Sequence, residues 1–289
     1  MRVGALRYAA QVLGPCVLVQ DCSWQHRMSA VLRMRDADGL TWFVKRFRDR
    51  DRYDAELLAY RDWVPKLGGS APRLRACSDS LATIILSAVP GDPAPWPAPD
   101  AGSLSAAERS AEQAIHRRAG ELLRAFHAGH PTGARGDLGT AKVAEFDQLR
   151  PLAEGPLTER ELQRARAAVA ALAGIPCAGL VPCHRDYTPR NWLVGDGALS
   201  VVDFEWSRLD VWVSDLARLH LGVWPDRPDL GEAFLGGYGV RLTDTDWATL
   251  RGCAVVTAVW LVIKARETRQ ASFENASRRA LARLLTTDR

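Results

Sequence analysis

With 289 residues, of which 47% are hydrophobic, the chain can bury a large core and is long enough for two lobes. A formal net charge of +4 is too small to indicate nucleic-acid binding, and six scattered cysteines without a Cys-x-x-Cys pair indicate neither a zinc site nor a disulfide framework. The N-terminus lacks the apolar core of a signal peptide, and the longest apolar run, Cys253 to Ile263, is too short to span a bilayer. We therefore expect a soluble, cytoplasmic enzyme that binds neither membrane nor nucleic acid.

The N-terminal third of the chain predicts a sheet with one helix. Runs of β-branched and aromatic residues between turn signals predict strands at Cys16–Asp21, Met28–Arg35, Leu40–Phe47 and Leu81–Leu86. A helix is expected from about Asp51 to Lys66, because Leu57, Tyr60 and Val64 form an apolar face. The polar connector between the first two strands, residues 23–27, contains no glycine.

The rest of the chain predicts mainly helices. Capping boxes at Ser105 and Thr158 begin two of them, one ending near His127 and one running to Gly174. Residues 137–155, between these helices, lack a periodic pattern and are expected to form an irregular connector that is a candidate for facing substrate. Five prolines between residues 90 and 102 predict an ordered linker, and further helices are expected near residues 213–220, 229–236, 246–269 and 273–285.

A short loop in the middle of the chain carries polar residues that suit chemistry. His184, Asp186 and Asn191 lie within eight residues, and Pro189 keeps the residue before it out of the helical region. A hairpin follows, with strands at residues 192–194 and 199–202, so Asp203 is expected at a strand end near Asn191. A carboxylate and an amide oxygen on adjacent strand ends suit Mg²⁺.

These motifs resemble those of the aminoglycoside phosphotransferase and choline kinase-like family of small-molecule kinases. The residues that carry the resemblance are the His-x-Asp-x-x-x-x-Asn loop from His184 to Asn191, the strand end Val201-Val-Asp203, and Asp215-Leu-Ala217. The resemblance implies a bilobal, protein-kinase-like α+β fold. Residues 1–88 would form a small antiparallel-sheet lobe that binds nucleotide, and residues 89–289 a larger, mainly helical lobe.

The resemblance also implies roles for single residues, with ATP or GTP as cosubstrate. Asp186 would be the catalytic base, and Asn191 and Asp203 would hold Mg²⁺. Lys45 would contact the nucleotide phosphates, with Glu56 as its partner.

The segment Ser87, Ala88 and Val89 would meet the adenine ring through backbone groups. His184 would support the loop, Glu205 is a candidate to assist the metal through water, and Asp215 is expected to brace the catalytic loop from its helix.

The nature of the acceptor follows from what the chain lacks. Nine residues separate Glu205 from Asp215 with no Ala-Pro-Glu motif, and Thr188 stands where protein kinases usually have lysine, so a small substrate is favoured over a protein. From Trp206 onward there are twelve Lys or Arg and ten Asp or Glu, which favours a neutral acceptor, such as a nucleoside or sugar-containing antibiotic, over a polycation. A metabolic kinase for choline, homoserine or a sugar, and a nucleotide-binding pseudokinase, are the alternatives.

Overall fold

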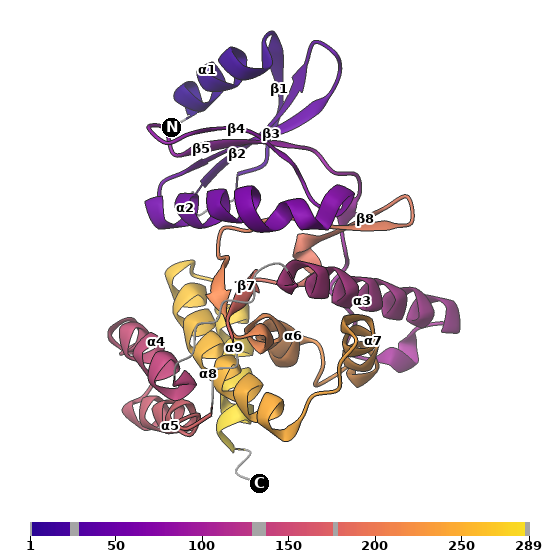
Figure 1. Ribbon diagram of the computed structural model, residues 1–289. Coiled ribbons are helices and arrows are strands. Elements are labelled where there is room, and N and C mark those ends of the chain that lie inside the picture. The colour runs from indigo at the N-terminus through magenta and orange to yellow at the C-terminus, as the bar shows by residue number, and fades with distance from the viewer. Residues whose placement is uncertain (1, 24–28, 129–136, 176–178, 287–289) are drawn as a thin grey trace. The chain divides into compact units, whose positions relative to one another are not determined.

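The computed structural model describes residues 2–23, 29–128, 137–175 and 179–286 (Figure 1). Its contacts gather in two compact units. The first comprises residues 1–96 and 184–208, and the second comprises residues 97–183 and 209–289. The loop from His184 to Asn191 and its hairpin therefore belong by their contacts to the same unit as the N-terminal sheet. The lobe boundary expected between residues 88 and 89 stays a prediction. The two units are groups of contacting residues, and they need not coincide with the lobes of the fold.

The first unit is built on a five-stranded antiparallel sheet in the order β1-β2-β3-β5-β4. Its strands are β1 (Cys16–Asp21), β2 (Ser29–Asp36), β3 (Thr41–Phe47), β4 (Leu74–Ser78) and β5 (Thr83–Ser87). The four strands expected in this region are confirmed within two residues at each end, and β4 had not been expected. In β2, alternate residues are buried, as the period of two requires when one face of a sheet covers a core.

Two helices lie on opposite faces of this sheet (Figure 1). Helix α1 (Arg2–Leu13), which no sequence pattern had indicated, buries Ala5 and Ala9 against Leu32 and Met34 of β2. Helix α2 (Arg50–Leu58) is capped by the side chain of Asp49 and continues through a π-helical turn, Ala59–Trp63, into a 3-10 segment. The single helix expected over residues 51–66 therefore changes its winding after Leu58.

The hairpin expected after the catalytic loop is confirmed. It consists of β8 (Trp192–Gly195) and β9 (Ala198–Val201), and the short strand β6 (Asp92–Pro93) pairs with β8. A 3-10 turn at Pro189–Asn191 joins the loop to β8.

The second unit is mainly helical. Its helices are α3 (Ala106–His127), α4 (Leu138–Ala153), α5 (Glu159–Ala170), α6 (Ala217–Gly222), α7 (Pro228–Tyr238), α8 (Asp244–Glu267) and α9 (Ala271–Thr286), and β7 (Val181–Cys183) pairs with β10 (Arg208–Asp210). Both capping boxes predicted from the sequence are formed. Helices α3 and α7 cross closely, because a Cβ at Gly120 would overlap the carbonyl oxygen of Phe234 and one at Gly237 would overlap that of Arg117.

The prediction of an irregular connector over residues 137–155 is wrong, since α4 occupies most of it. The helix begins at Asp137, whose side chain accepts a hydrogen bond from the backbone of Gly139. Its buried face includes Lys142, whose ammonium binds Asp210 at 2.7 Å. A lysine on the inner face hides the apolar periodicity that would otherwise have indicated the helix.

Helix α8 forms the centre of the helical unit. By length and composition it is also apolar enough to cross a membrane, with a mean hydropathy of 1.5 over its most apolar window. Within the protein, 72% of that window is buried, as in the core helix of a folded domain.

Candidate active site

Lys45 is the centre of a charge cluster that lies within the first unit. It sits on β3, where Val44 packs into the sheet core, so that the lysine points to the face covered by α2. Its Nζ lies 2.6 Å from Glu56 Oε2 on α2, 2.6 Å from Asp203 Oδ1 and 3.1 Å from Glu205 Oε2. The structure therefore brings the predicted pair Lys45 and Glu56 together and joins it to the predicted metal ligand Asp203.

Burial and charge oppose each other in this cluster. Burial acts to lower the pKa of Lys45, but Asp203, Glu56 and Glu205 outweigh it and hold that pKa well above its ordinary value. Burial raises the pKa of Glu56 to about 8, against the attraction of Lys45. The pKa of Asp203 is lowered, because Lys45 more than offsets the desolvation of the carboxylate. Arg52 of α2 also binds Glu205 at 2.9 Å, so the three carboxylates face two cations, and one negative charge remains for a further cation when Glu56 is ionised.

The catalytic loop is held by its own hydrogen bonds. Asp186 is buried, and its Oδ2 accepts a hydrogen bond from Asn191 Nδ2 at 3.1 Å, while the Asp186 carbonyl accepts another from the same nitrogen at 2.9 Å. The guanidinium of Arg190 also forms an ion pair with Asp186 Oδ2. The loop thus fixes Asp186 from two sides, and the amide oxygen of Asn191 is directed away from these bonds.

His184 ties the loop to the strand end that carries Asp203. Its Nε2 lies 3.0 Å from the carbonyl oxygen of Val202, and its Nδ1 lies 3.3 Å from the amide nitrogen of Asp186. These partners fit a neutral ring that donates at Nε2 and accepts at Nδ1. The amide of Val202 donates to the Asn191 carbonyl at 3.0 Å, and the following residue, Asp203, takes a left-handed φ of 69°. The chain therefore turns at Asp203, directly after the strand end that His184 binds, which agrees with the expectation that His184 supports the loop.

The oxygen atoms near Lys45 fit a hard divalent cation. Carboxylate oxygens of Glu56, Asp203 and Glu205 all lie within 4.8 Å of one another. Only the Asp203 side chain is substantially exposed, at 37%, whereas Glu56 is at 1% and Glu205 at 13%. Oxygen donors with a partly open carboxylate suit Mg²⁺. The pairing of Asn191 with Asp203 as ligands stays a prediction.

The predicted adenine-contacting segment is partly engaged within the sheet. Ser87 donates its amide to the Arg73 carbonyl at 2.9 Å, and Ala88 donates its amide to the Thr41 carbonyl at 3.1 Å. These two N–H groups are therefore occupied by neighbouring strands. The contact with adenine stays a prediction that now falls on Val89 and on carbonyl groups of the segment.

The connector at residues 23–27, including His26 and Arg27, lies largely outside the described residues.

Two arginines at the site had not been identified from the sequence. Arg52 on α2 donates to Glu205 Oε1 at 2.9 Å and stacks 4.0 Å from the centre of the Trp206 ring. Arg190 pairs with Asp186, as described above. The available signal was spacing, because Arg52 is four residues before Glu56 on one helix face and Arg190 is four residues after Asp186. The spacing of Arg190 points to its partner Asp186, whereas the spacing of Arg52 does not point to Glu205.

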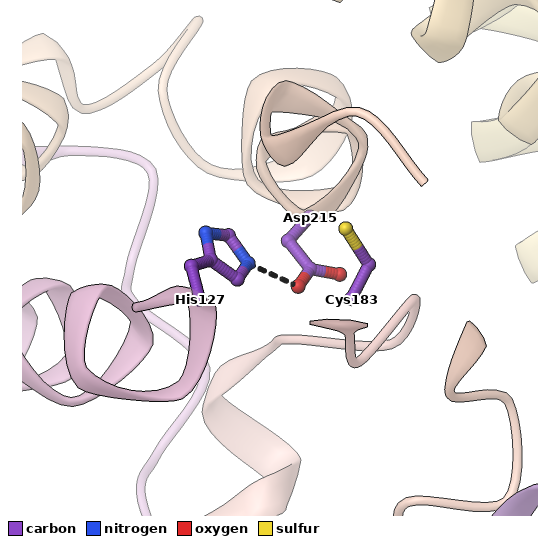
Figure 2. A group of neighbouring side chains, drawn as sticks. All are labelled: His127, Cys183 and Asp215. Atoms are coloured by element: carbon purple, nitrogen blue, oxygen red, sulfur yellow. Dashed lines mark hydrogen bonds and ion pairs between the residues drawn. The ribbon is translucent and has the colours of Figure 1, made fainter. Parts of the chain in front are cut away.

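A second cluster with metal-ligand chemistry lies in the helical unit. His127, Cys183 and Asp215 place one possible ligand atom each within 4.8 Å of the others (Figure 2). Both ring nitrogens of His127 already have oxygen partners, Asp215 Oδ2 at 3.0 Å and Tyr238 Oη at 2.8 Å. We interpret the cluster as a buried hydrogen-bond network. The expected bracing of the catalytic loop by Asp215 stays a prediction.

Known proteins share this architecture. The chain matches the family model of the phosphotransferase enzyme family over residues 26–253. No curated protein matches it. A macrolide 2'-phosphotransferase, MphH from Brachybacterium faecium, is 19% identical, with 96% of this chain and 97% of that chain covered and a TM-score of 0.62.

Two further solved structures have the same fold. A choline/ethanolamine kinase family protein from Mesorhizobium loti is 18% identical, covers 99% of this chain and 95% of its own, and gives a TM-score of 0.65. A thermostable mutant of aminoglycoside phosphotransferase APH(4)-Ia, in ternary complex with ADP and hygromycin B, is 12% identical, with 98% of each chain covered and a TM-score of 0.72. The predicted kinase-like fold is thereby confirmed. Because the family model spans most of the chain, this protein belongs to the phosphotransferase enzyme family and is a small-molecule kinase.

Proposed function

We propose that the protein transfers the γ-phosphoryl group of ATP or GTP, in a Mg²⁺-dependent reaction in the cytoplasm, to a hydroxyl group of a small antibiotic of the nucleoside or neutral glycoside kind. The observation that carries the proposal is the cluster in which Lys45 binds Glu56, Asp203 and Glu205 at 2.6 to 3.1 Å. Such a cluster supplies both a phosphate-binding ammonium and carboxylates for a divalent cation. The neighbour in complex with ADP supports a nucleotide as cosubstrate.

In this mechanism, Lys45 binds the phosphates of the nucleotide, and Glu56 holds the ammonium in place. Asp203 and Asn191 would hold the metal, with Glu205 beside them. When bound, Mg²⁺ supplies charge neutralisation to the phosphates.

Asp186 accepts a hydrogen bond from the acceptor hydroxyl and directs its oxygen towards the γ-phosphorus. The transition state of phosphoryl transfer is loose, so Asp186 acts mainly by positioning and takes the proton late. Asn191 assists by holding Asp186 Oδ2 at 3.1 Å.

A neutral acceptor is favoured by the near balance of charge after Trp206, with twelve bases and ten acids. A metabolic acceptor is the second candidate, and the neighbour from the choline/ethanolamine kinase family supports it. A pseudokinase is disfavoured, because Lys45, Asp186, Asn191 and Asp203 are all present.

The test is a coupled assay of ADP and GDP release over panels of antibiotics and of metabolites, with the phosphorylated product identified by mass. We expect product from a neutral nucleoside or glycoside antibiotic. A kanamycin-like aminoglycoside turned over with higher kcat/KM than every neutral compound would overturn the antibiotic class proposed here. Product from choline or a sugar alone would establish the metabolic alternative.

A further inference from the structure

The inference concerns Arg190 and rests on the proposed function, which it deepens by naming a feature of the acceptor. Arg190 lies in the 3-10 turn at Pro189–Asn191, between the predicted base and the predicted metal ligand in sequence. Its guanidinium forms an ion pair with Oδ2 of Asp186, four residues earlier. The same oxygen accepts a hydrogen bond from Asn191 at 3.1 Å.

The two partners in this ion pair differ in exposure. The side chain of Asp186 is 2% exposed, whereas that of Arg190 is 49% exposed. The base is thus buried and the guanidinium beside it faces solvent. A compound that brings a hydroxyl to Asp186 must therefore come close to the positive charge of Arg190.

This charge is permanent. Although partial burial acts to lower it, the pKa of Arg190 is raised above its usual value because Asp186, Asp203 and Glu205 surround the guanidinium with negative charge. An arginine keeps its proton in any case, and it presents several N–H donors in one plane. One carboxylate oxygen does not use all of these donors. The group therefore offers donors and positive charge to whatever lies next to the reacting hydroxyl.

We propose that Arg190 is a specificity-determining residue that selects acceptors with an oxygen atom, neutral or anionic, next to the reacting hydroxyl and rejects those with an ammonium group at that position. A neighbouring hydroxyl, carbonyl or carboxylate oxygen accepts a hydrogen bond from the guanidinium. A protonated amine in the same place has no acceptor lone pair and is repelled. This local charge acts at the base itself, independently of the overall charge of the helical unit.

The experiment uses acceptors in pairs that differ by one amino group in place of a hydroxyl beside another hydroxyl. Suitable pairs are glucose with glucosamine, and the best acceptor of the release screen with its amino analogue, each assayed at a pH at which the amine is protonated. The ratio of kcat/KM within each pair is measured for the wild-type enzyme and for Arg190→Gln and Arg190→Glu. We expect the wild type to prefer the hydroxyl member by about tenfold or more, as for one poorly screened charge pair. Arg190→Gln should reduce the ratio towards one, and Arg190→Glu should invert it.

A matched control separates this effect from a change in overall charge. Arg75→Glu makes the same change of charge on an exposed position of β4, and it should leave every ratio at the wild-type value. Equal ratios in the wild type and Arg190→Glu, with product formed in both, would overturn the inference alone. If the wild type phosphorylates no member of any pair and no compound of the screen, the proposed function fails and the inference falls with it.

Discussion

The two units differ in how many carboxylates gather around a buried cation. In the helical unit, Arg227 is 1% exposed and binds Glu112 and Asp229, and Lys142 is 4% exposed and binds Asp210. Each of these two cations binds two carboxylates, since Lys142 also binds Glu145 at 3.0 Å. Around Lys45 in the first unit, three carboxylates meet at one ammonium, Arg52 binds one of them as well, and Asp203 remains 37% exposed. Buried charges whose partners satisfy them are structural, whereas an excess of one sign with an exposed member is what a ligand can complete.

The two candidate metal clusters repeat this contrast. Both meet the same distance criterion of 4.8 Å. In the cluster around His127, the ring nitrogens are bound to Asp215 and Tyr238, so a metal would have to break existing hydrogen bonds. In the cluster around Asp203, three carboxylates face the two cations Lys45 and Arg52. The distances between possible ligand atoms do not distinguish the two clusters, but the hydrogen bonds that these atoms already make do.

Breaking the His127 network should have the largest effect, on stability. Asp215→Ala removes a buried partner of His127 at 3.0 Å and is expected to lower the free energy of unfolding by roughly 3 kcal/mol. Chemical denaturation measures this. The Mg²⁺ dependence of any remaining activity should match that of the wild type. A shifted Mg²⁺ titration with unchanged stability would mean that the network belongs to the active site.

Asp186→Ala should have the largest effect on turnover. Losing a positioning base is expected to lower kcat at least about 100-fold, with nucleotide binding nearly intact. Single-turnover kinetics and nucleotide titration measure the two quantities. Turnover within a few-fold of wild type would remove Asp186 from its assigned role.

Asp203→Asn tests whether the open cluster takes a cation. The carboxylate, Mg²⁺ and phosphates would form one charge cluster, so nucleotide affinity and Mg²⁺ dependence should weaken together, by about tenfold. The unfolding free energy should change far less than for Asp215→Ala, because Asp203 is the exposed member of its cluster. An unchanged Mg²⁺ titration would reduce Asp203 to a structural partner of Lys45.

Much of the candidate site could be predicted from the sequence, because its residues follow one another along a loop and a hairpin. The hairpin brings His184 and Asn191 into hydrogen bonds with Val202, the residue before Asp203. The pairing of Arg52 with Glu205 could not be predicted in this way, since only folding brings these distant residues together, whereas Arg190 lies four residues after its partner Asp186.

The same reasoning explains which parts of the fold were predicted. Strand β2 and the capping boxes of α3 and α5 were predicted, because the alternation of apolar and polar residues and the capping pairs each depend on residues close together in the sequence. Helix α4 was missed, because the ion pair of Lys142 with Asp210 lets a charged residue occupy the buried face. Long-range partners of this kind override local pattern.

His116 gives a test of the helical unit by pH. Burial, with a further contribution from Arg227, lowers its pKa to about 4, below the value near 6.5 expected for the unfolded chain. As the pH falls below about 6.5, the unfolded state binds this proton first, so stability is lost between about pH 6.5 and 4. The loss should amount to roughly 1–2 kcal/mol between pH 6.5 and 5. His116→Gln should remove that part of the slope, and an identical slope in the variant would contradict the assignment.

A substitution at Thr188 should have the smallest effect on the free energy of unfolding, and it should raise that free energy where the other substitutions lower it. Its side chain is fully buried in the catalytic loop, and its Oγ1 has no hydrogen-bond partner among the described residues. A buried hydroxyl without a partner has lost its hydration without compensation, whereas valine has nearly the same shape and no polar atom. Thr188→Val should therefore raise the free energy of unfolding by about 1 kcal/mol.

Thr188→Ser provides the matched control, because it keeps the hydroxyl and removes the methyl group, and it should be destabilising. The backbone of the loop should be unaffected in both variants, since the Thr188 carbonyl that accepts the Asn191 amide at 2.9 Å is retained. A valine variant less stable than wild type would mean that the hydroxyl has a partner in the folded protein. Groups without a full set of partners would then include Asp203 but not Thr188 in the loop before it.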